Sequence, residues 1–544
     1  MNNIEFLIFN LLFFFLGRSI IQVFYKNKLS DESKIFGTSI FIFYPIFGLI
    51  AVSSISFLLN FFVKLENSRY LILFVFIILI IIKNRNFRFS ENKLFLIFNY
   101  IVIPLILAFS SYDIKLHYDA ESYHLNSQSW ILNSKIVFGL ANYYIWAGHS
   151  SLYEYTQSFF HGENFIYLHY LNLVFFSFFI NFLNYHLIRK KNNFFYNLSF
   201  ILLMFGILDN FGIGGGSNGF IQIQMAGKPD VGVGILFFVI SMMMIYGLYE
   251  EKSNKNEIQI LFILLTFAIQ LRILSVSLIF FLIPYLLKNK YLFYKVVKSK
   301  YSIFLIFYNF LWLLKNVIVS SCLFFPLKFT CFSRLNWNID SEIISISNYY
   351  SNWPLAYKFN SSFIAFIETW ITRGHISQQV PNLFLSILLI GVLRYMVFNK
   401  TGERYFLVYL INFFVFITLL TTTFNIRYSF GFILVLVGTL SFNLIWKNEY
   451  KFLNNKYLIY SMFLILSVGI PRGYSYSYFI QNPSYYELNI DKTQIDVTEN
   501  IDGYGVKSNN NKCFNIYQCS TFQFSDNEKV KPKKNILNYK IFTD

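Results

Sequence analysis

Charged residues are scarce in this sequence. Only 13% of its 544 residues are Asp, Glu, Lys or Arg, whereas an ordinary soluble domain contains about 25%. Hydrophobic residues make up 56% of the chain, which is more than a soluble core of this length could bury. The composition therefore excludes a soluble globular protein and predicts an all-α polytopic membrane protein.

Acidic residues are the scarcer of the two charges. The chain has 28 Asp and Glu against 45 Lys and Arg, which gives a net charge of +17. In a soluble protein this excess would suggest nucleic-acid binding. Here the basic residues fall between apolar runs, so we interpret them as cytoplasmic loop residues that orient the helices. Membrane lipid is the expected partner, and no nucleic-acid partner is expected.

A cleavable signal and a cysteine metal motif are both missing. No basic region precedes the first apolar run, and no small-residue cleavage site follows it, so this run is expected to remain as a helix. The four cysteines form no CxxC spacing. They fall in two close pairs, Cys322 with Cys331 and Cys513 with Cys519.

Apolar segments predict about thirteen or fourteen transmembrane helices, since one crossing needs about 20 residues. They lie at 4–24, 36–62, 70–83, 94–111, 165–188, 195–210, 231–249, 258–271, 273–287, 301–320, 383–398, 404–423, 428–446 and 456–472. The division near Arg272 fits either a hairpin of two helices or one long broken helix. We divide the chain into N-terminal helices at 1–93, a membrane core at 94–472 and a C-terminal tail at 473–544.

Loop charge predicts the orientation. Five basic clusters fall on one side if fourteen crossings are counted, and that side is the cytoplasm. This count favours the hairpin at Arg272. The N-terminus, the loops at 112–164 and 321–382, and the tail are then extracytoplasmic, with the tail expected to form a small cap. Both cysteine pairs would lie in an oxidising compartment, which predicts the disulfides Cys322–Cys331 and Cys513–Cys519. Four free thiols are the alternative.

The stretch from His117 to His161 is the first long polar passage of the chain. Asp119 suits a helix N-cap or first turn. The seven-residue spacing of Tyr118, Leu125 and Leu132 suits an amphipathic helix on the membrane surface. On that helix His117, Glu121 and His124 would share one face, which could hold a divalent metal or present a carboxylate to a substrate hydroxyl. An interfacial helix with solvated polar residues is the alternative.

A second acid and four cations fall near the outer ends of other segments. Asp230 follows Lys228 and Pro229 at the start of one segment, where an acid complements the helix dipole. A set of cations near one membrane level could bind the phosphate of an anionic lipid head group; this set is Lys228, Arg272, Lys315 and Arg427. Four independent interfacial anchors would give the same pattern.

These motifs resemble the GT-C superfamily of integral-membrane glycosyltransferases. Three motifs carry the resemblance, and they are also similar to those of bacterial membrane proteins associated with surface-polysaccharide synthesis: Tyr118-Asp119-Ala120-Glu121-Ser122-Tyr123-His124-Leu125, Lys228-Pro229-Asp230, and Trp312-x-x-Lys315-Asn316 with Ser320-Ser321-Cys322 and Pro326. The resemblance implies a bacterial inner-membrane enzyme that transfers a sugar from a polyprenyl-phosphate donor to a glycan or lipid acceptor on the outer face.

The resemblance also implies roles for single residues. Asp119 matches the loop acid of the family, which acts as a general base or helps to bind metal, and Asp230 matches its second acid. The sequence departs from the family in having about three additional helices before the loop and no adjacent acid pair. A polysaccharide polymerase or ligase is the alternative function. A transporter of lipid-linked sugars is disfavoured, because the helices carry few mid-span charges and show no paired halves.

Overall fold

The structure is a computed structural model, and most of what it describes is helical. The residues described are 2–25, 29–31, 33–85, 87, 93–116, 119–149, 151–162, 165–189, 193–211, 225–226, 229–249, 253–341, 343–345, 347, 388, 391–392, 394–395, 398–400, 412, 430–442, 444–446, 455–471, 473–481, 497–499, 506–508, 519–520, 532–536 and 539–542.

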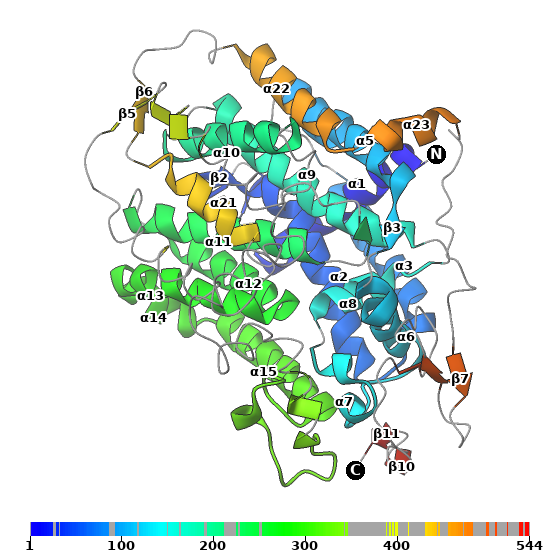
Figure 1. The fold of residues 1–544 in the computed structure, drawn as a ribbon. Coiled ribbons are helices and arrows are strands. Elements are labelled where there is room, and N and C mark those ends of the chain that lie inside the picture. The colour runs from blue at the N-terminus through cyan, green and yellow to red at the C-terminus, as the bar shows by residue number, and fades with distance from the viewer. Residues whose placement is uncertain are drawn as a thin grey trace, which may run out of the picture.

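The N-terminal half contains long helices and several shorter helical segments (Figure 1). Its helical elements are α1 (Asn2–Phe24), η1 (Ile40–Phe43), α2 (Tyr44–Asn60), α3 (Leu65–Asn84), α4 (Lys93–Ile97), η2 (Phe98–Val102), α5 (Ile103–Leu107), η3 (Ala108–Asp113), η4 (Ala120–His124), α6 (Leu125–Asn133), α7 (Leu140–Tyr143), η5 (Ile145–His149), α8 (Leu152–Phe159), α9 (Ile166–Arg189), α10 (Asn193–Phe211) and α11 (Asp230–Tyr249).

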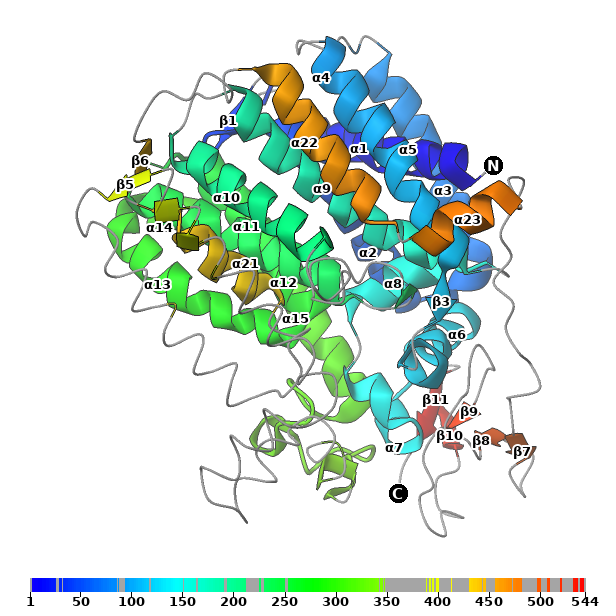
Figure 2. The ribbon, with the colours of Figure 1, turned by 45° about the horizontal axis from the view of Figure 1, so that its top comes forward.

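The remaining helical elements lie between Lys255 and Gln481. They are α12 (Lys255–Leu271), η7 (Ile273–Leu278), α13 (Ile279–Lys288), α14 (Lys290–Val297), α15 (Lys300–Ser320), η8 (Lys328–Thr330), α21 (Phe430–Thr439), α22 (Lys456–Gly469) and α23 (Gly473–Gln481). In both ribbon views α22 lies alongside α5 and α9, so a late helix packs against the N-terminal half (Figures 1 and 2).

Short strands make only small local sheets in the part of the chain described. The strands are β1 (Lys34–Ile35), β2 (Thr38–Ser39), β3 (Lys115–Leu116), β4 (Met225–Ala226), β5 (Phe398–Lys400), β6 (Leu444–Trp446), β7 (Val497–Glu499), β8 (Val506–Ser508), β9 (Cys519–Ser520), β10 (Pro532–Ile536) and β11 (Tyr539–Phe542). β3 pairs with β4 in parallel, and β11 contacts α7.

Seven helical spans among the described residues are long and apolar enough to cross a membrane, and a bent pair, residues 273–288 with 290–297, makes a possible eighth. The seven are Asn2–Phe24, Ile40–Asn60, Leu65–Asn84, Lys93–Tyr112, Ile166–Arg189, Asp230–Tyr249 and Lys300–Ser320. Shorter apolar helices cover 193–208, 430–439 and 456–469. The described part is thus compatible with a polytopic helical membrane protein. The predicted segment 404–423, apart from Asn412, and most of 383–398 lie outside the described residues.

The predicted hairpin at Arg272 is present. Arg272 has an extended backbone (φ −156°, ψ 125°) that ends α12 and an ion pair to Asp230, the first residue of α11. Sixteen residues later, Lys288 donates to the carbonyls of Gly247 and Leu248 in the last turn of α11. The chain after Arg272 therefore runs back along α11, which is the course of a hairpin and not of a single broken crossing.

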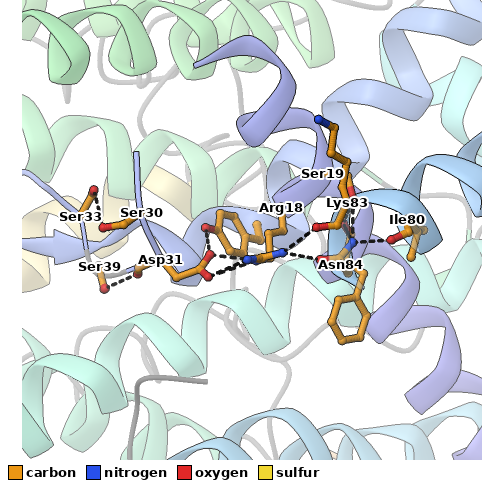
Figure 3. Close-up of polar contacts among 11 residues, drawn as sticks. Arg18, Ser19, Ser30, Asp31, Ser33, Ser39, Ile80, Lys83 and Asn84 are labelled. Atoms are coloured by element: carbon orange, nitrogen blue, oxygen red, sulfur yellow. Dashed lines mark hydrogen bonds and ion pairs between the residues drawn. The ribbon is translucent and has the colours of Figure 1, made fainter. Parts of the chain in front are cut away.

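A polar cluster holds the end of the bundle that carries the basic loops (Figure 3). Arg18 on α1 binds Asp31 through Nε (2.9 Å) and Nη2 (2.9 Å), and its Nη1 donates to Asn84 Oδ1 (2.8 Å). Tyr44 donates to the same Asp31 carboxylate at 2.6 Å. Because a buried guanidinium must be paired, this cluster fastens α1, the 29–33 segment, α2 and α3 to one another.

Candidate functional site

Each of the two predicted aspartates follows one strand of the parallel pair β3–β4. Leu116 of β3 pairs with Ala226 of β4. Asp119 follows Leu116 by three residues, and Asp230 follows Ala226 by four. Parallel strands leave a sheet at the same edge, so the chain enters η4 and α11 from one place. Asp119 has helical backbone angles, and its side chain makes no capping hydrogen bond to the helix that it precedes, so the predicted N-cap bond is absent.

A ladder of polar side chains joins the η4–α6 helix to α8. Nδ1 of His124 donates to Oε1 of Glu154. One turn further along, Gln128 donates to Gln157 at 3.1 Å and accepts from Nδ1 of His161 at 2.8 Å. The spacing of four residues on one helix and three on the other keeps both pairs on facing sides. The ladder fixes the register in which His124 meets Glu154.

The helix α6 is not a solvated surface helix, which corrects that alternative from the sequence. Asn126 and Gln128 are fully buried, and Ser129 is nearly so. The helix packs against α8, which is itself buried along all eight residues. Figure 2 shows α6, α7, α8 and β3 gathered in one part of the molecule. The polar face predicted for water instead faces other polar helices.

Glu154 is the buried carboxylate at the centre of this arrangement. It is only 4% exposed. Its Oε2 atom is buried and has no hydrogen-bond partner among the described residues. A buried carboxylate normally has its lone pairs satisfied. The free oxygen therefore marks a place where a proton donor, such as a substrate hydroxyl or a water, would be stabilised.

Lys315 lies near the end of α15, as the sequence predicts, and its side chain is buried. The residue is 3% exposed, and its Nζ has one hydrogen-bond partner in the described part of the chain, Oδ1 of Asn316 at 3.4 Å. Its charge and that of Glu154 attract each other. Lys315 also lines a cavity between α6, α7 and α15, together with Ser127, Trp130 and Tyr144. This ammonium group is available to an anion that enters the cavity.

Arg272 forms an ion pair with Asp230, and each of the two charges affects the pKa of a buried side chain nearby. The Asp230 carboxylate, like that of Glu154, raises the pKa of the buried Tyr153, although burial is the main cause. Burial lowers the pKa of His149 to about 4, and the Arg272 guanidinium adds to the effect. His149 is therefore neutral at pH 7, and its Nε2 lies 2.7 Å from Oγ of Ser347.

Aromatic residues contact one another beside His124. Tyr144 donates its hydroxyl to the carbonyl of Tyr123 at 2.6 Å. Burial raises its pKa well above the ordinary value, so it remains a neutral hydrogen-bond donor. Trp146 stacks on Tyr123, with 4.6 Å between ring centroids. The Tyr123 ring in turn contacts the imidazole of His124, with 4.4 Å between ring centroids.

The structure describes two of the three predicted metal ligands, Glu121 and His124. No group of three His, Cys, Asp or Glu side chains in the described ranges has a metal-binding arrangement. His124 is bound to Glu154, and Glu121 is half-buried on the same helix. Four predicted site residues lie outside the described residues, namely His117, Lys228, Arg427 and Cys513. Cys322 and Cys331 form the predicted disulfide; the side chain of Cys519 lies outside the described part.

Sequence reasoning missed Glu154, although a signal was present. Glu154 is the only acid between Glu121 and Glu163. It sits within Leu152–Phe159, a segment with aromatic residues on both sides of the acid. A single carboxylate among aromatic residues is costly to bury unless it has a partner. The partner lies 30 residues earlier in the chain, where helical periodicity could not identify it.

Comparison with known families assigns the chain to one of them. The model of the family described as "Domain of unknown function (DUF8201)" matches residues 4–434, which is well over half of the sequence. The chain belongs to this family. No curated protein and no solved structure matches it.

Proposed function

We propose that this protein is a GT-C-type integral-membrane glycosyltransferase, which moves a sugar from a polyprenyl-phosphate donor to a hydroxyl of a glycan or lipid acceptor. The observation that carries the proposal is the buried His124–Glu154 pair with Lys315 beside it. Transfer to a hydroxyl needs a base for the hydroxyl proton and a positive charge for the departing phosphate. The pair and the lysine supply these two groups.

Each residue has a distinct role in the proposed reaction. Glu154 accepts a hydrogen bond from the Nδ1–H group of His124, which fixes the imidazole tautomer and leaves Nε2 able to accept a proton. Nε2 takes the proton of the acceptor hydroxyl as the hydroxyl oxygen bonds to the anomeric carbon. The bond from that carbon to the phosphate oxygen breaks, and the phosphate keeps the electron pair. Lys315 stabilises the released prenyl phosphate, and the single displacement inverts the anomeric centre.

The aspartates are assigned a supporting role. Asp230 is held in an ion pair by Arg272. Asp119 begins the helix that carries His124. The Asp230–Arg272 ion pair joins the start of α11 to the end of α12, and Ser151, just before α8, donates to the carbonyl of Leu271 at 2.6 Å. A divalent metal is not assigned a step, because the described side chains do not form a ligand set for one.

The location of the site supports an outer-face reaction. Lys315 lies in the last two turns of α15, and the basic cluster at Lys298 and Lys300 lies at the start of that helix. By the charge rule the end with the basic loops is cytoplasmic, so the site would face the outside of a bacterial inner membrane, with both chain termini on that side. The disulfide Cys322–Cys331 adjoins α15 at the site end, as expected in an oxidising compartment.

The test is restoration of the surface glycan in the native host after deletion of the gene. Glu154→Gln and His124→Gln should each lower glycan synthesis by about 100-fold or more, the usual contribution of general base catalysis. Glu66→Gln is the matched control, because Glu66 is an exposed acid paired with Lys64, and should retain wild-type synthesis. Membrane levels of all variants are compared by immunoblot.

Asp119→Asn distinguishes the two candidate bases. A loss with Asp119→Asn but not with Glu154→Gln or His124→Gln would assign the base to Asp119 and overturn the assignment of the pair. Wild-type glycan in all three variants at equal membrane level would overturn the glycosyltransferase proposal itself.

A further inference from the structure

A dense set of exposed lysines lies around α14, at the basic end of the bundle. The set is Lys288, Lys290, Lys295, Lys298 and Lys300, all exposed. The sequence has no Asp or Glu between Glu257 and Asp340. Among the described residues none of these five lysines forms an ion pair. Lys288 is bound to backbone carbonyls of α11, so four ammonium groups remain directed to the surroundings.

The acids at this end of the described chain are already engaged. Asp31 is bound by Arg18 and Tyr44. Glu257 accepts from the backbone N–H groups of Phe36 and Asn254, each at 2.7 Å. The positive charge around α14 is therefore not balanced by a neighbouring carboxylate of the described chain.

The helix α14 has one packed face and one exposed face. It is bent by 103° from the preceding helical segment. Val296 is buried, and Phe293 packs on Phe262 of α12 at 5.8 Å between ring centroids. Tyr291 (67%) and Tyr294 (57%) are exposed on the other face. Tyrosine with lysine on one exposed face is typical of a helix that lies in the head-group layer of a membrane.

The lysines and tyrosines of α14 also contact each other. Lys295 Nζ lies 4.3 Å from the ring centroid of Tyr291, and Lys298 Nζ lies 4.2 Å from that of Tyr294. Such cation–π contacts hold the ammonium groups along the tyrosine rings. The basic and aromatic residues thus form one continuous surface.

Apolar surfaces border α14 on both sides along the chain. Ile283 and Leu287 are exposed on α13 before it. Ile303, Phe304 and Phe307 are exposed on α15 after it. These helices have the composition of lipid-facing spans, so α14 lies where the lipid-facing surface ends. In a membrane, lipid head groups would occupy that level, and α14 lies on the opposite side of the molecule from α6 in both views (Figures 1 and 2).

We propose that α14 and its flanking lysines bind the phosphate of anionic phospholipids in the adjoining membrane leaflet. The negative head group complements the lysines, and the tyrosines lie at the boundary between acyl chains and head groups. The site is separate from the His124–Glu154 region and does not depend on the proposed glycosyl transfer.

The test measures lipid binding by the purified full-length protein in nanodiscs. Native mass spectrometry compares retention of phosphatidylglycerol with that of phosphatidylcholine of the same chain length. Wild type is expected to retain the anionic lipid at least tenfold better. The variant Lys290→Gln/Lys295→Gln/Lys298→Gln should lose most of this preference. Replacing the same three lysines by arginine should keep it, because the charge is retained.

A control variant tests whether the lipid preference depends on the lysines around α14. A soluble competitor tests whether the bound phosphate belongs to a lipid or to a free anion. Lys64→Gln/Lys328→Gln removes two exposed lysines elsewhere on the molecule and should leave the preference unchanged. Added glycerol phosphate should not displace the lipid, because it lacks the acyl chains. Equal retention of the two lipids by wild type, or an equal loss in the glutamine and control variants, would overturn the proposal. Displacement by glycerol phosphate would also overturn it and would show a soluble anion site instead.

Discussion

Asp230 and Arg272 form an ion pair between the first residue of α11 and the residue that ends α12. Their side chains are 10% and 23% exposed, so each charge relies on the other. The pair fastens the hairpin turn beside Tyr153 and Glu154. The sequence assigned the two residues to different roles, a catalytic acid and a phosphate ligand, and the structure makes each the partner of the other.

A double-mutant cycle tests this ion pair. Asp230→Asn and Arg272→Gln should each destabilise the protein by about 3 kcal/mol, because each leaves one poorly solvated charge without its partner. The double variant should be less destabilised than the sum of the two. Thermal unfolding of the purified protein in detergent measures the three effects. Lys64→Gln is the control, since an exposed pair contributes less than about 1 kcal/mol. Additive losses would show that the two charges do not stabilise each other.

Stability is expected to fall as the pH falls from about 6.5 to about 4. Burial lowers the pKa of His149 and of His161 to about 4, with Arg272 and Arg69 as the respective second causes. Between about pH 6.5 and pH 4 the unfolded chain binds protons at these histidines that the folded chain does not bind. Each histidine therefore adds a slope of up to about 1.4 kcal/mol per pH unit, with stability rising as the pH rises.

Amide replacements separate these histidines from the carboxylates that titrate in the same range. His161→Asn can keep a donor near the position of Nδ1, which binds Gln128, and His149→Gln can keep one near Nε2, which faces Ser347. Unfolding temperatures at pH 7.5, 6.0 and 5.0 should show a shallower decline in each variant than in wild type. Parallel declines in wild type and both variants would contradict the assignment.

Much of the helical plan could be predicted from composition and periodicity. The hairpin at Arg272 followed from the count of basic loops, because a single crossing would have placed Lys288 and Lys290 on the opposite side from the other basic clusters. Apolar length predicts where a helix lies, since a long hydrophobic run has few other stable forms in a membrane. The strand pair that joins Leu116 to Ala226 had no such signal, because each strand is only two residues long.

The candidate site could be predicted only in part, for a physical reason. His124 was found because it lies in a visibly polar motif, but its partner Glu154 lies on another helix. A long-range pair leaves no periodic trace in either segment. Lys315 was placed near a helix end, but its burial and the nearby charge of Glu154 were not predicted. Burial of a charge depends on what packs over it, and a single segment does not contain that information.

Close packing of α1 on α2 should make Gly17 intolerant of any side chain. A Cβ at Gly17 would lie 1.8 Å from the carbonyl oxygen of Tyr44, and one at Gly48 would lie 2.3 Å from that of Phe13. Both clashes are with backbone, which cannot move aside without separating the helices. Gly17→Ala should therefore destabilise the protein by about 2 kcal/mol or more, as overpacking in a core does.

Gly162→Ala is the matched control for this substitution. A Cβ at Gly162 would lie 3.8 Å from the ring of Tyr167, an ordinary contact distance. Thermal unfolding in detergent should show a clear decrease for Gly17→Ala and almost none for Gly162→Ala. A Gly17→Ala protein as stable as wild type would mean that α1 and α2 are farther apart than described. The hydrogen bonds from Arg18, the next residue on α1, to the Asp31 carboxylate would then have to span a longer distance.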